Sequence, residues 1–361
     1  MAGPEVRRSL SSHAQLRRMP ALVLQRMIDH LPPDTPPSGP DGPVEVLQQR
    51  IADLLGTPAA LFFPTGAMAQ QVALRVHAGR RGRVTFAAHP TNHLTLWEQQ
   101  GFSAVHGLRY HPIGDPNRLL TVEDLAAVAE PLAAVVFELP QREIGGQLPA
   151  WDDLVAQVEL ARERGAAVHL DGARLWEAQP YYERSFAEIA ALFDSVYVSL
   201  YKGLQGVRGA VLAADRSIVD EAAVWRHRLG GAIPEAWPLA VSALIGLDDL
   251  LPRMPAFRDH AVAIAAAVNA GTEASTVPAQ PPTPLFHVHL PVSKDAADRA
   301  QEAMLAEHGT QLFSRTRTSP DPNRCAFEVS VGENAMEFTP AEVVGLLHEL
   351  LDRATDRAMT P

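Results

Sequence analysis

The hydrophobic positions divide the chain into three stretches of different texture. Residues 1–45 are rich in proline and glycine, above all between Leu31 and Pro43. Because proline fixes φ and has no N–H to donate, we expect this stretch to be an extended N-terminal arm or loop.

Short apolar runs alternate with helical patterns between residues 46 and 234. Strands are predicted over residues 59–63, 83–86, 104–108, 133–139, 166–170, 195–200 and 209–213, and helices over 44–54, 66–76, 121–129 and 151–164. Continuous apolar strands separated by amphipathic helices indicate a mostly parallel sheet covered on both faces. The predicted fold class is α/β, with residues 46–234 as the large domain.

The pattern changes again over residues 235–361. Helices are predicted up to residue 251, over 256–270 and over 341–352, and strands over 285–290 and 327–331. A few helices and strands of this kind are typical of a smaller C-terminal α+β domain attached to a large one.

Charge and composition favour a small-molecule partner. The formal net charge of -11 leaves no basic surface for nucleic acid or anionic lipid. No apolar run is long enough for a membrane helix and the start lacks the apolar centre of a signal peptide, so we expect a cytoplasmic protein. Cys325 is the only cysteine, which excludes an internal disulfide and thiolate metal clusters.

Lysine is rare in this chain. Lys202 and Lys294 are the two lysines, so 29 of the 31 basic residues are arginine (31 minus 2). Imine formation requires a primary amine, which arginine does not offer. Lys294 lies in a polar stretch and is interpreted as a solvated residue at a helix start, which leaves Lys202 as the candidate nucleophile.

An acid and an amine follow two predicted strands. Asp171 comes after the strand over residues 166–170, and Lys202 lies 31 residues later, after the next strand. Because the carboxyl ends of parallel strands share one edge of a sheet, this spacing brings both side chains together. The pair suits pyridoxal 5'-phosphate: the amine holds the aldehyde, and the carboxylate keeps the pyridine nitrogen protonated.

The same segments resemble a known family. His-Leu-Asp-Gly-Ala-Arg-Leu at 169–175 and Phe-Asp-Ser-Val-Tyr-Val-Ser-Leu-Tyr-Lys-Gly-Leu at 193–204 resemble signatures of the threonine aldolases and their β-eliminating-lyase relatives, over roughly residues 44–232. The resemblance implies the pyridoxal-phosphate enzyme fold of aspartate aminotransferase, fold type I. It also implies that Lys202 carries the cofactor as a Schiff base, that Asp171 pairs with the pyridine nitrogen, and that Arg174 contacts the cofactor or the substrate carboxylate.

Other positions match the family's cofactor site. Thr65, Gly66 and Ala67 resemble its phosphate loop at a helix start, although Thr-Gly is also a common plain cap. Ser199 and Arg208 are the further phosphate contacts that the resemblance implies. His93 stands where the family stacks an imidazole on the pyridine ring, and its neutral form can relay a proton.

The substrate side departs from the family. No basic residue follows Leu229-Gly-Gly231 to reach a neighbouring subunit's phosphate, and Glu328 falls where an arginine usually binds the substrate carboxylate. The expected replacement is Arg142, which follows a predicted strand; Arg174 is a second candidate. Further arginines near the C-terminus are open alternatives, namely Arg315, Arg317 and Arg324.

The predicted activity is cleavage of the Cα–Cβ bond of a β-hydroxy-α-amino acid to glycine and an aldehyde. The alternative is another pyridoxal-phosphate reaction on an amino acid, such as β-elimination, racemisation or transamination; an inactive binding protein would have no use for Lys202. No metal is expected, because His287 and His289 share one strand face without a third ligand. The resemblance implies a homodimer or homotetramer with the active site at the subunit interface.

Overall fold

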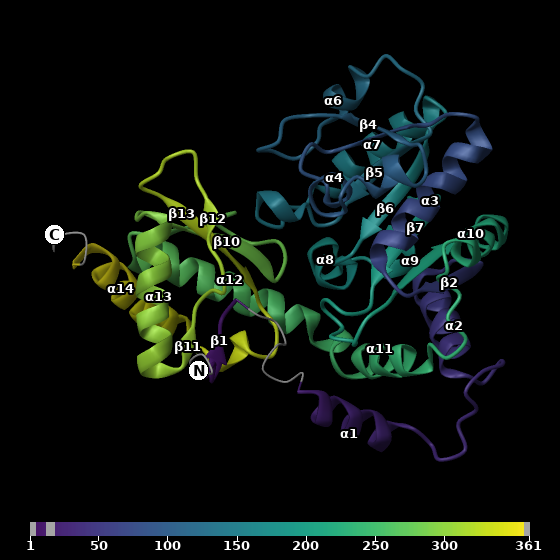
Figure 1. Cartoon of the computed structure of the whole chain (residues 1–361). Helices are drawn as coiled ribbons and strands as arrows, with labels where there is room; N and C mark the ends of the chain where they lie inside the picture. Colours follow the sequence, from purple (N-terminus) through teal and green to yellow (C-terminus); the bar gives the residue numbers. More distant parts are fainter. Residues whose placement is uncertain (1–4, 12–18, 357–361) are drawn as a thin grey trace. The chain divides into compact units, whose positions relative to one another are not determined.

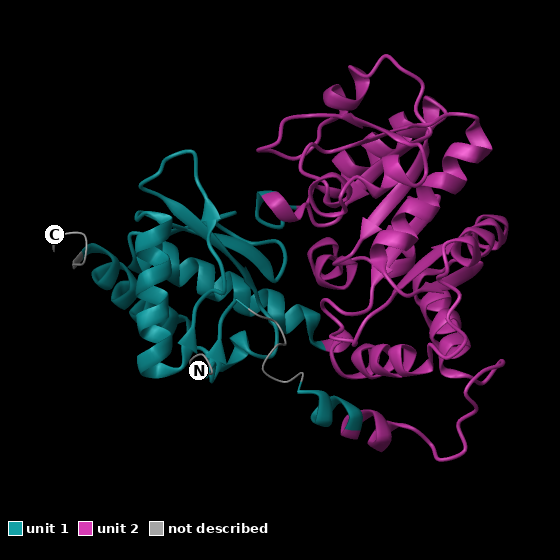
Figure 2. Cartoon of the chain, in the orientation of Figure 1, with its two compact units in different colours: residues 1–24, 144–147, 253–361 teal, residues 25–143, 148–252 magenta. Residues whose placement is uncertain are grey.

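The computed structural model describes residues 5–11 and 19–356. The chain forms two compact units (Figure 2). Unit 1 comprises residues 1–24, 144–147 and 253–361, and unit 2 comprises residues 25–143 and 148–252. The predicted boundaries at residues 45 and 234 stay predictions of folding domains.

Unit 2 contains a seven-stranded sheet with the order β2-β8-β7-β6-β5-β3-β4 (Figure 1). Its strands are β2 Ala59–Phe63, β3 Thr85–Ala88, β4 Arg109–Pro112, β5 Ala134–Glu138, β6 Ala167–Gly172, β7 Ser195–Ser199 and β8 Ala210–Ala214. The pairs from β4 to β7 are parallel, and β8 runs antiparallel to both β7 and β2. The prediction of a mostly parallel sheet is confirmed.

The helices of unit 2 begin and end where the local sequence provides caps. They are α2 Pro43–Leu55, α3 Gly66–Arg81, α4 His93–Trp97, α5 Gly101–Ala104, α6 Val122–Ala126, α7 Trp151–Glu163, α8 Leu175–Tyr182, α9 Phe186–Ala190, α10 Arg216–Arg228 and α11 Trp237–Asp249. In α3, the Thr65 side chain caps the start, and Gly82 adopts the left-handed conformation that ends the helix.

Both faces of the central sheet are covered, as its apolar strands predict. In β6 the side chains of His169 and Asp171 point to one face and those of Val168 and Leu170 to the other, and all four residues are buried. Helix α3 supplies residues to two apolar clusters of the core, one with β2, β7, β8 and α10, the other with β3 and β5. A buried sheet edge is therefore available to hold polar groups away from water.

Unit 1 has a four-stranded antiparallel sheet with the order β12-β13-β10-β9 and a short parallel pair of β1 with β11. Its strands are β1 Arg8–Ser9, β9 Ser275–Val277, β10 Leu285–Leu290, β11 Thr310–Gln311, β12 Arg317–Thr318 and β13 Cys325–Ser330. Its helices are α12 Met254–Gly271, α13 Lys294–His308 and α14 Pro340–Asp356. Lys294 is the first residue of α13, as predicted.

Three short 3-10 turns complete the described elements. They are η2 Arg142–Ile144, η3 Leu251–Arg253 and η4 Ala335–Glu337. Among the described residues, no helix combines the length and apolar character needed to cross a bilayer.

Two predictions from the sequence are wrong. Residues 20–30 form helix α1, Pro20–His30, instead of an extended arm, because Pro20 occupies a first position that needs no N–H donor and the prolines between Leu31 and Pro43 come after the helix. The strand predicted over 104–108 is β4, Arg109–Pro112, which begins five residues later. Leu108 lies in the core beside Phe102, but Gly107 has a positive φ, so the chain turns there before the strand begins.

Candidate active site

Three neighbouring parallel strands bring polar residues to one edge of the sheet of unit 2. Glu138 is the last residue of β5, and Asp171 is the penultimate residue of β6. Strand β7 ends at Ser199, and Lys202 follows three residues later. Glu138 and Asp171 are direct neighbours in the register. Open α/β sheets bind their ligands at this edge.

Lys202 lies in a small pocket at this edge of the sheet. The pocket is lined by His93, Glu138, Leu139, Pro140, Arg142, Asp171, Ala173, Arg174 and Lys202. Burial and the charge of Arg174 lower the pKa of Lys202 from 10.5 to about 8, although Asp171 and Glu138 oppose the shift. An appreciable fraction of the amine is therefore neutral near pH 7, as nucleophilic attack requires.

Asp171 is held by a donor at each oxygen. Gln70 Nε2, from α3, donates to Oδ2 at 2.7 Å, and the backbone N–H of Ala173 donates to Oδ1 at 3.1 Å. The residue is 2% exposed. These bonds fix the direction of the Asp171 carboxyl group within the pocket.

His93 is the first residue of α4, and its position is set by the cap before it. The Asn92 side chain accepts a hydrogen bond from the Thr95 N–H at 3.2 Å, which fixes the start of the helix. Burial and the charge of Lys202 lower the pKa of His93 to about 4, although Asp171 opposes the shift. The imidazole is therefore neutral near pH 7 and can accept a proton.

The predicted phosphate loop lies at the start of α3. Thr65 Oγ1 accepts a hydrogen bond from the Met68 N–H at 3.3 Å, and Gly66 and Ala67 are the first two helical residues. A Cβ atom added to Gly66 would lie 2.1 Å from Tyr197 Oη. Tyr197 neighbours Asp171 across the β6–β7 pair. The start of α3 therefore lies next to β7, the strand that pairs with Asp171. Backbone N–H groups at a helix start of this kind can bind a phosphate dianion.

Ser199 and Arg208 lie outside the set of residues that line the Lys202 pocket. Ser199 is buried, and its Oγ accepts a 3.4 Å hydrogen bond from the Tyr201 N–H. The Arg208 guanidinium lies 4.8 Å from the centre of the Tyr201 ring. Their roles as phosphate contacts stay predictions.

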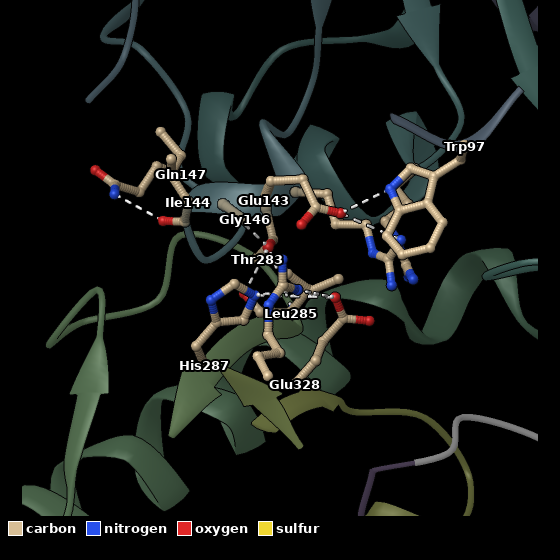
Figure 3. Close-up of polar contacts among 12 residues, drawn as sticks. Trp97, Glu143, Ile144, Gly146, Gln147, Thr283, Leu285, His287 and Glu328 are labelled. Carbon is tan, nitrogen blue, oxygen red and sulfur yellow. Dashed lines mark hydrogen bonds and ion pairs between the residues drawn. The ribbon is translucent and has the colours of Figure 1, made fainter. Parts of the chain in front are cut away.

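Two predicted substrate arginines line the pocket. Arg174 and Glu177 form a buried ion pair at 3.0 Å. Arg142 forms an ion pair with Glu143 at 3.6 Å and lies 5.8 Å from the centre of the Trp97 ring. Figure 3 shows the Trp97 indole N–H donating to Glu143 at 3.0 Å. The Arg142 guanidinium is thus supported on two sides next to the Lys202 pocket.

The other candidate arginines belong to unit 1. Glu328, in β13, forms an ion pair with Arg317 at 3.5 Å, and Arg317 also contacts His287 Nε2 at 3.2 Å. The charge of Glu328 is therefore balanced within its own unit. Arg324 directly precedes β13, and its role in substrate binding stays a prediction.

Three functional candidates escaped the sequence reasoning. Gln70 looks like an ordinary helical residue, and nothing in the sequence predicts its contact with Asp171. Glu98 Oε2 accepts a hydrogen bond from Gln71 Nε2 at 2.9 Å, and burial together with the charge of Asp171 raises the pKa of Glu98 to about 7. Glu138 directly ends the apolar run of β5, so the rule that drew attention to Asp171 also applies to it.

A comparison with protein families shows to which family the chain belongs. The family model "Beta-eliminating lyase" matches residues 25–289, which include every residue that lines the Lys202 pocket. The chain belongs to the β-eliminating lyase family. The family resemblance inferred from the aspartate and lysine segments is confirmed.

The curated relatives of this chain include threonine aldolases. The Low-specificity L-threonine aldolase 1 of Arabidopsis thaliana is 28% identical over 62% of this chain and 64% of its own length. The Low specificity L-threonine aldolase of Escherichia coli K12 is 30% identical over 62% of this chain and 68% of its own. The chain thus spans just under two thirds of the Arabidopsis relative.

Two solved structures match this chain over nearly its whole length. A Listeria monocytogenes protein provisionally named L-allo-threonine aldolase is 35% identical, with a TM-score of 0.90 and 97% of both chains covered. An Exiguobacterium protein, provisionally an aromatic amino acid β-eliminating lyase or threonine aldolase, is 34% identical with a TM-score of 0.89. The fold is that of the pyridoxal-phosphate-dependent enzymes of fold type I, as predicted.

The residues present fit pyridoxal 5'-phosphate, the cofactor of this lyase family. Lys202 provides a half-buried primary amine of lowered pKa, and Asp171 provides a carboxylate with both oxygens oriented. The Tyr197 hydroxyl group packs against Gly66 at the start of α3, where a Cβ would collide with it. This donor set matches an aldehyde, a pyridine nitrogen and a phosphate.

Proposed function

We propose that the protein is a pyridoxal-phosphate-dependent aldehyde-lyase that cleaves the Cα–Cβ bond of β-hydroxy-α-amino acids to glycine and an aldehyde. The observation that carries the proposal is that Lys202, Asp171, His93 and Arg142 line one buried pocket. Threonine aldolases among the curated relatives and solved structures support the same reaction.

The cofactor supplies an aldehyde that joins to amines and an electron-poor ring that accepts the electron pair of the broken bond. The chain's residues supply the surroundings. Lys202 offers its neutral amine, and Asp171 provides the negative charge that balances a protonated ring nitrogen. The helix start at Gly66 offers backbone N–H groups to a phosphate.

His93 and Arg142 are the proposed substrate-side groups. A neutral His93 imidazole accepts the proton of the β-hydroxyl group as that group becomes an aldehyde. Arg142 would pair with the substrate carboxylate and so fix the orientation of the bonds at Cα.

The activity test is direct. Purified protein with added pyridoxal phosphate is incubated with L-threonine, L-allo-threonine and phenylserine, and glycine and aldehyde are assayed together. We expect both products from at least one substrate, no turnover with Lys202→Ala, and full turnover with Lys294→Ala, the matched lysine control. Cofactor-loaded protein that releases no glycine would overturn the aldolase proposal, and pyruvate with ammonia as products would indicate β-elimination instead.

We also propose a homo-oligomer, a homodimer or homotetramer, located in the cytoplasm. Support for assembly comes from helix α1, whose apolar side chains Leu22, Leu24 and Ile28 are each about 60% exposed. Exposed apolar groups gathered on one helix mark an interaction surface. Light scattering on the eluting peak should give a mass of at least twice 39.1 kDa, and a Leu22→Glu, Ile28→Glu variant should dissociate. A monomer at micromolar concentration would contradict this assembly.

A further inference from the structure

Glu138 is a half-buried acid in the cofactor pocket to which the proposed reaction gives no role. It ends β5 beside Asp171 and lines the pocket with Lys202. Taking a carboxyl group out of water is costly unless it is hydrogen-bonded, and an apolar residue at this strand end would avoid the cost. We therefore expect the Glu138 carboxyl group to have specific hydrogen-bond partners.

The carboxylate of Glu138 connects two segments that are far apart in the sequence. Its Oε1 accepts a hydrogen bond from the backbone N–H of Arg142 at 3.2 Å. Its Oε2 accepts one from the backbone N–H of His93 at 3.3 Å and one from Gln141 Nε2 at 3.4 Å. One side chain thus holds the start of α4 and the start of η2 at the same pocket wall.

The electrostatic surroundings of Glu138 act on its pKa in two directions. Burial and the charge of Asp171 raise the pKa of Glu138 to about 8, although the bonds from Arg142 and His93 and the charge of Lys202 lower it. The net shift favours the protonated acid near pH 7, and its two oxygens can still accept the N–H bonds of Arg142 and His93. Without this side chain, both donors would lose an acceptor in a half-buried region.

We propose that Glu138 is a positioning residue that ties the backbone of His93 to that of Arg142, so that the two substrate-side groups keep a fixed spacing across the pocket. The inference rests on the proposed function only for the tasks of His93 and Arg142. Glu138 itself need not touch substrate. Its effect passes through the two backbone contacts.

The test measures amino-acid binding rather than turnover. Glycine is titrated into cofactor-loaded protein, and its dissociation constant is read from the absorbance of the bound cofactor. In Glu138→Gln an NH2 group replaces one acceptor, so one backbone N–H loses its partner whichever way the amide points. We expect the glycine Kd to rise about tenfold, the order expected when one buried donor is left unpaired.

A double-mutant cycle identifies the route of the effect. If Glu138 acts through the Arg142 side chain, Glu138→Gln should change the glycine Kd less than about twofold in an Arg142→Ala background. Glu130→Gln is the matched control, because Glu130 is a carboxylate of the same unit bonded to Thr85 and Arg109 outside the pocket. It should leave the Kd unchanged.

Each outcome decides the proposal. An unchanged glycine Kd in Glu138→Gln, or an equal increase with and without the Arg142 side chain, overturns it. Should Glu138→Gln not fold, Glu138→Asp takes its place, with a carboxylate too short to reach both segments and a smaller increase expected. If neither variant folds, the carboxylate serves folding and the positioning role falls. Because glycine binding needs no bond cleavage, a protein without aldolase activity would sink the proposed function and leave this test intact.

Discussion

The reactivity of the two lysines offers the sharpest test of the pocket. Burial lowers the pKa of Lys202 to about 8, whereas the bond from Lys294 to Asp298 raises the pKa of Lys294 above its usual value of 10.5. At pH 7 about 10% of the Lys202 amine is neutral, compared with about 0.03% for an amine of pKa 10.5. The free amine is therefore roughly 300 times more abundant at Lys202.

The assay traps imines on cofactor-free protein. A brief exposure to low pyridoxal phosphate between pH 6 and 10 is followed by borohydride, and the labelled peptides are quantified by mass spectrometry. Because the lowered pKa frees the amine as pH rises, labelling at Lys202 should increase with a midpoint near 8. Lys202→Arg should lose this label, and Lys294→Arg should keep it. Faster labelling of Lys294, or a Lys202 midpoint above pH 10, would refute the reasoning.

Three further predictions concern cofactor binding and the stability of the fold. Gln70→Met removes a donor from Asp171 and should weaken pyridoxal-phosphate binding by about tenfold or more in a fluorescence titration, because bonds to charged groups contribute roughly 1.5–3 kcal/mol; an unchanged affinity would contradict this. Gly66→Ala places a Cβ against Tyr197 and should lower the melting temperature by several degrees, and Tyr197→Phe should restore part of the loss; equal melting temperatures for all variants would show that no clash exists. Burial lowers the pKa of His77 to about 3, so the neutral imidazole stabilises the folded state fully above the unfolded pKa of 6.5. As pH falls from 6.5 toward 3, the free energy of unfolding should decrease by up to about 1.4 kcal/mol per pH unit. Urea unfolding between pH 4 and 7 should give a shallower acid slope for His77→Gln than for the parent protein, and parallel slopes would argue against a neutral buried imidazole.

The central chemistry could be predicted because it follows from strand order. Asp171 and Lys202 each come after an apolar strand, and parallel neighbours place their carboxyl ends at one edge. The scarcity of lysine pointed to the same residue. The placement of His93 and Arg142 in that pocket came from the family resemblance and from a predicted strand end, respectively.

Other parts of the site depend on contacts between distant segments. Gln70 lies 101 residues before Asp171, and its amide becomes relevant only because α3 packs on β6. Glu138 reads as the polar end of a strand until the fold brings His93 and Arg142 to its two oxygens. Such pairs carry no periodic signal within a short window, so pattern analysis does not find them.

The sequence by itself determined the α/β class, the strand ends that carry the acid and the amine, and the preference for an amine-dependent cofactor. These features depend on local periodicity and on residue chemistry, which are written in consecutive positions. Only the tertiary structure decided the ionisation of the pocket, the helical form of residues 20–30 and the role of Glu138. The pKa of a buried group depends on the loss of water and on the charges and hydrogen bonds around it, and these come from many segments of the chain. The hydrogen-bond partners of a carboxyl group such as that of Glu138 likewise meet only after folding.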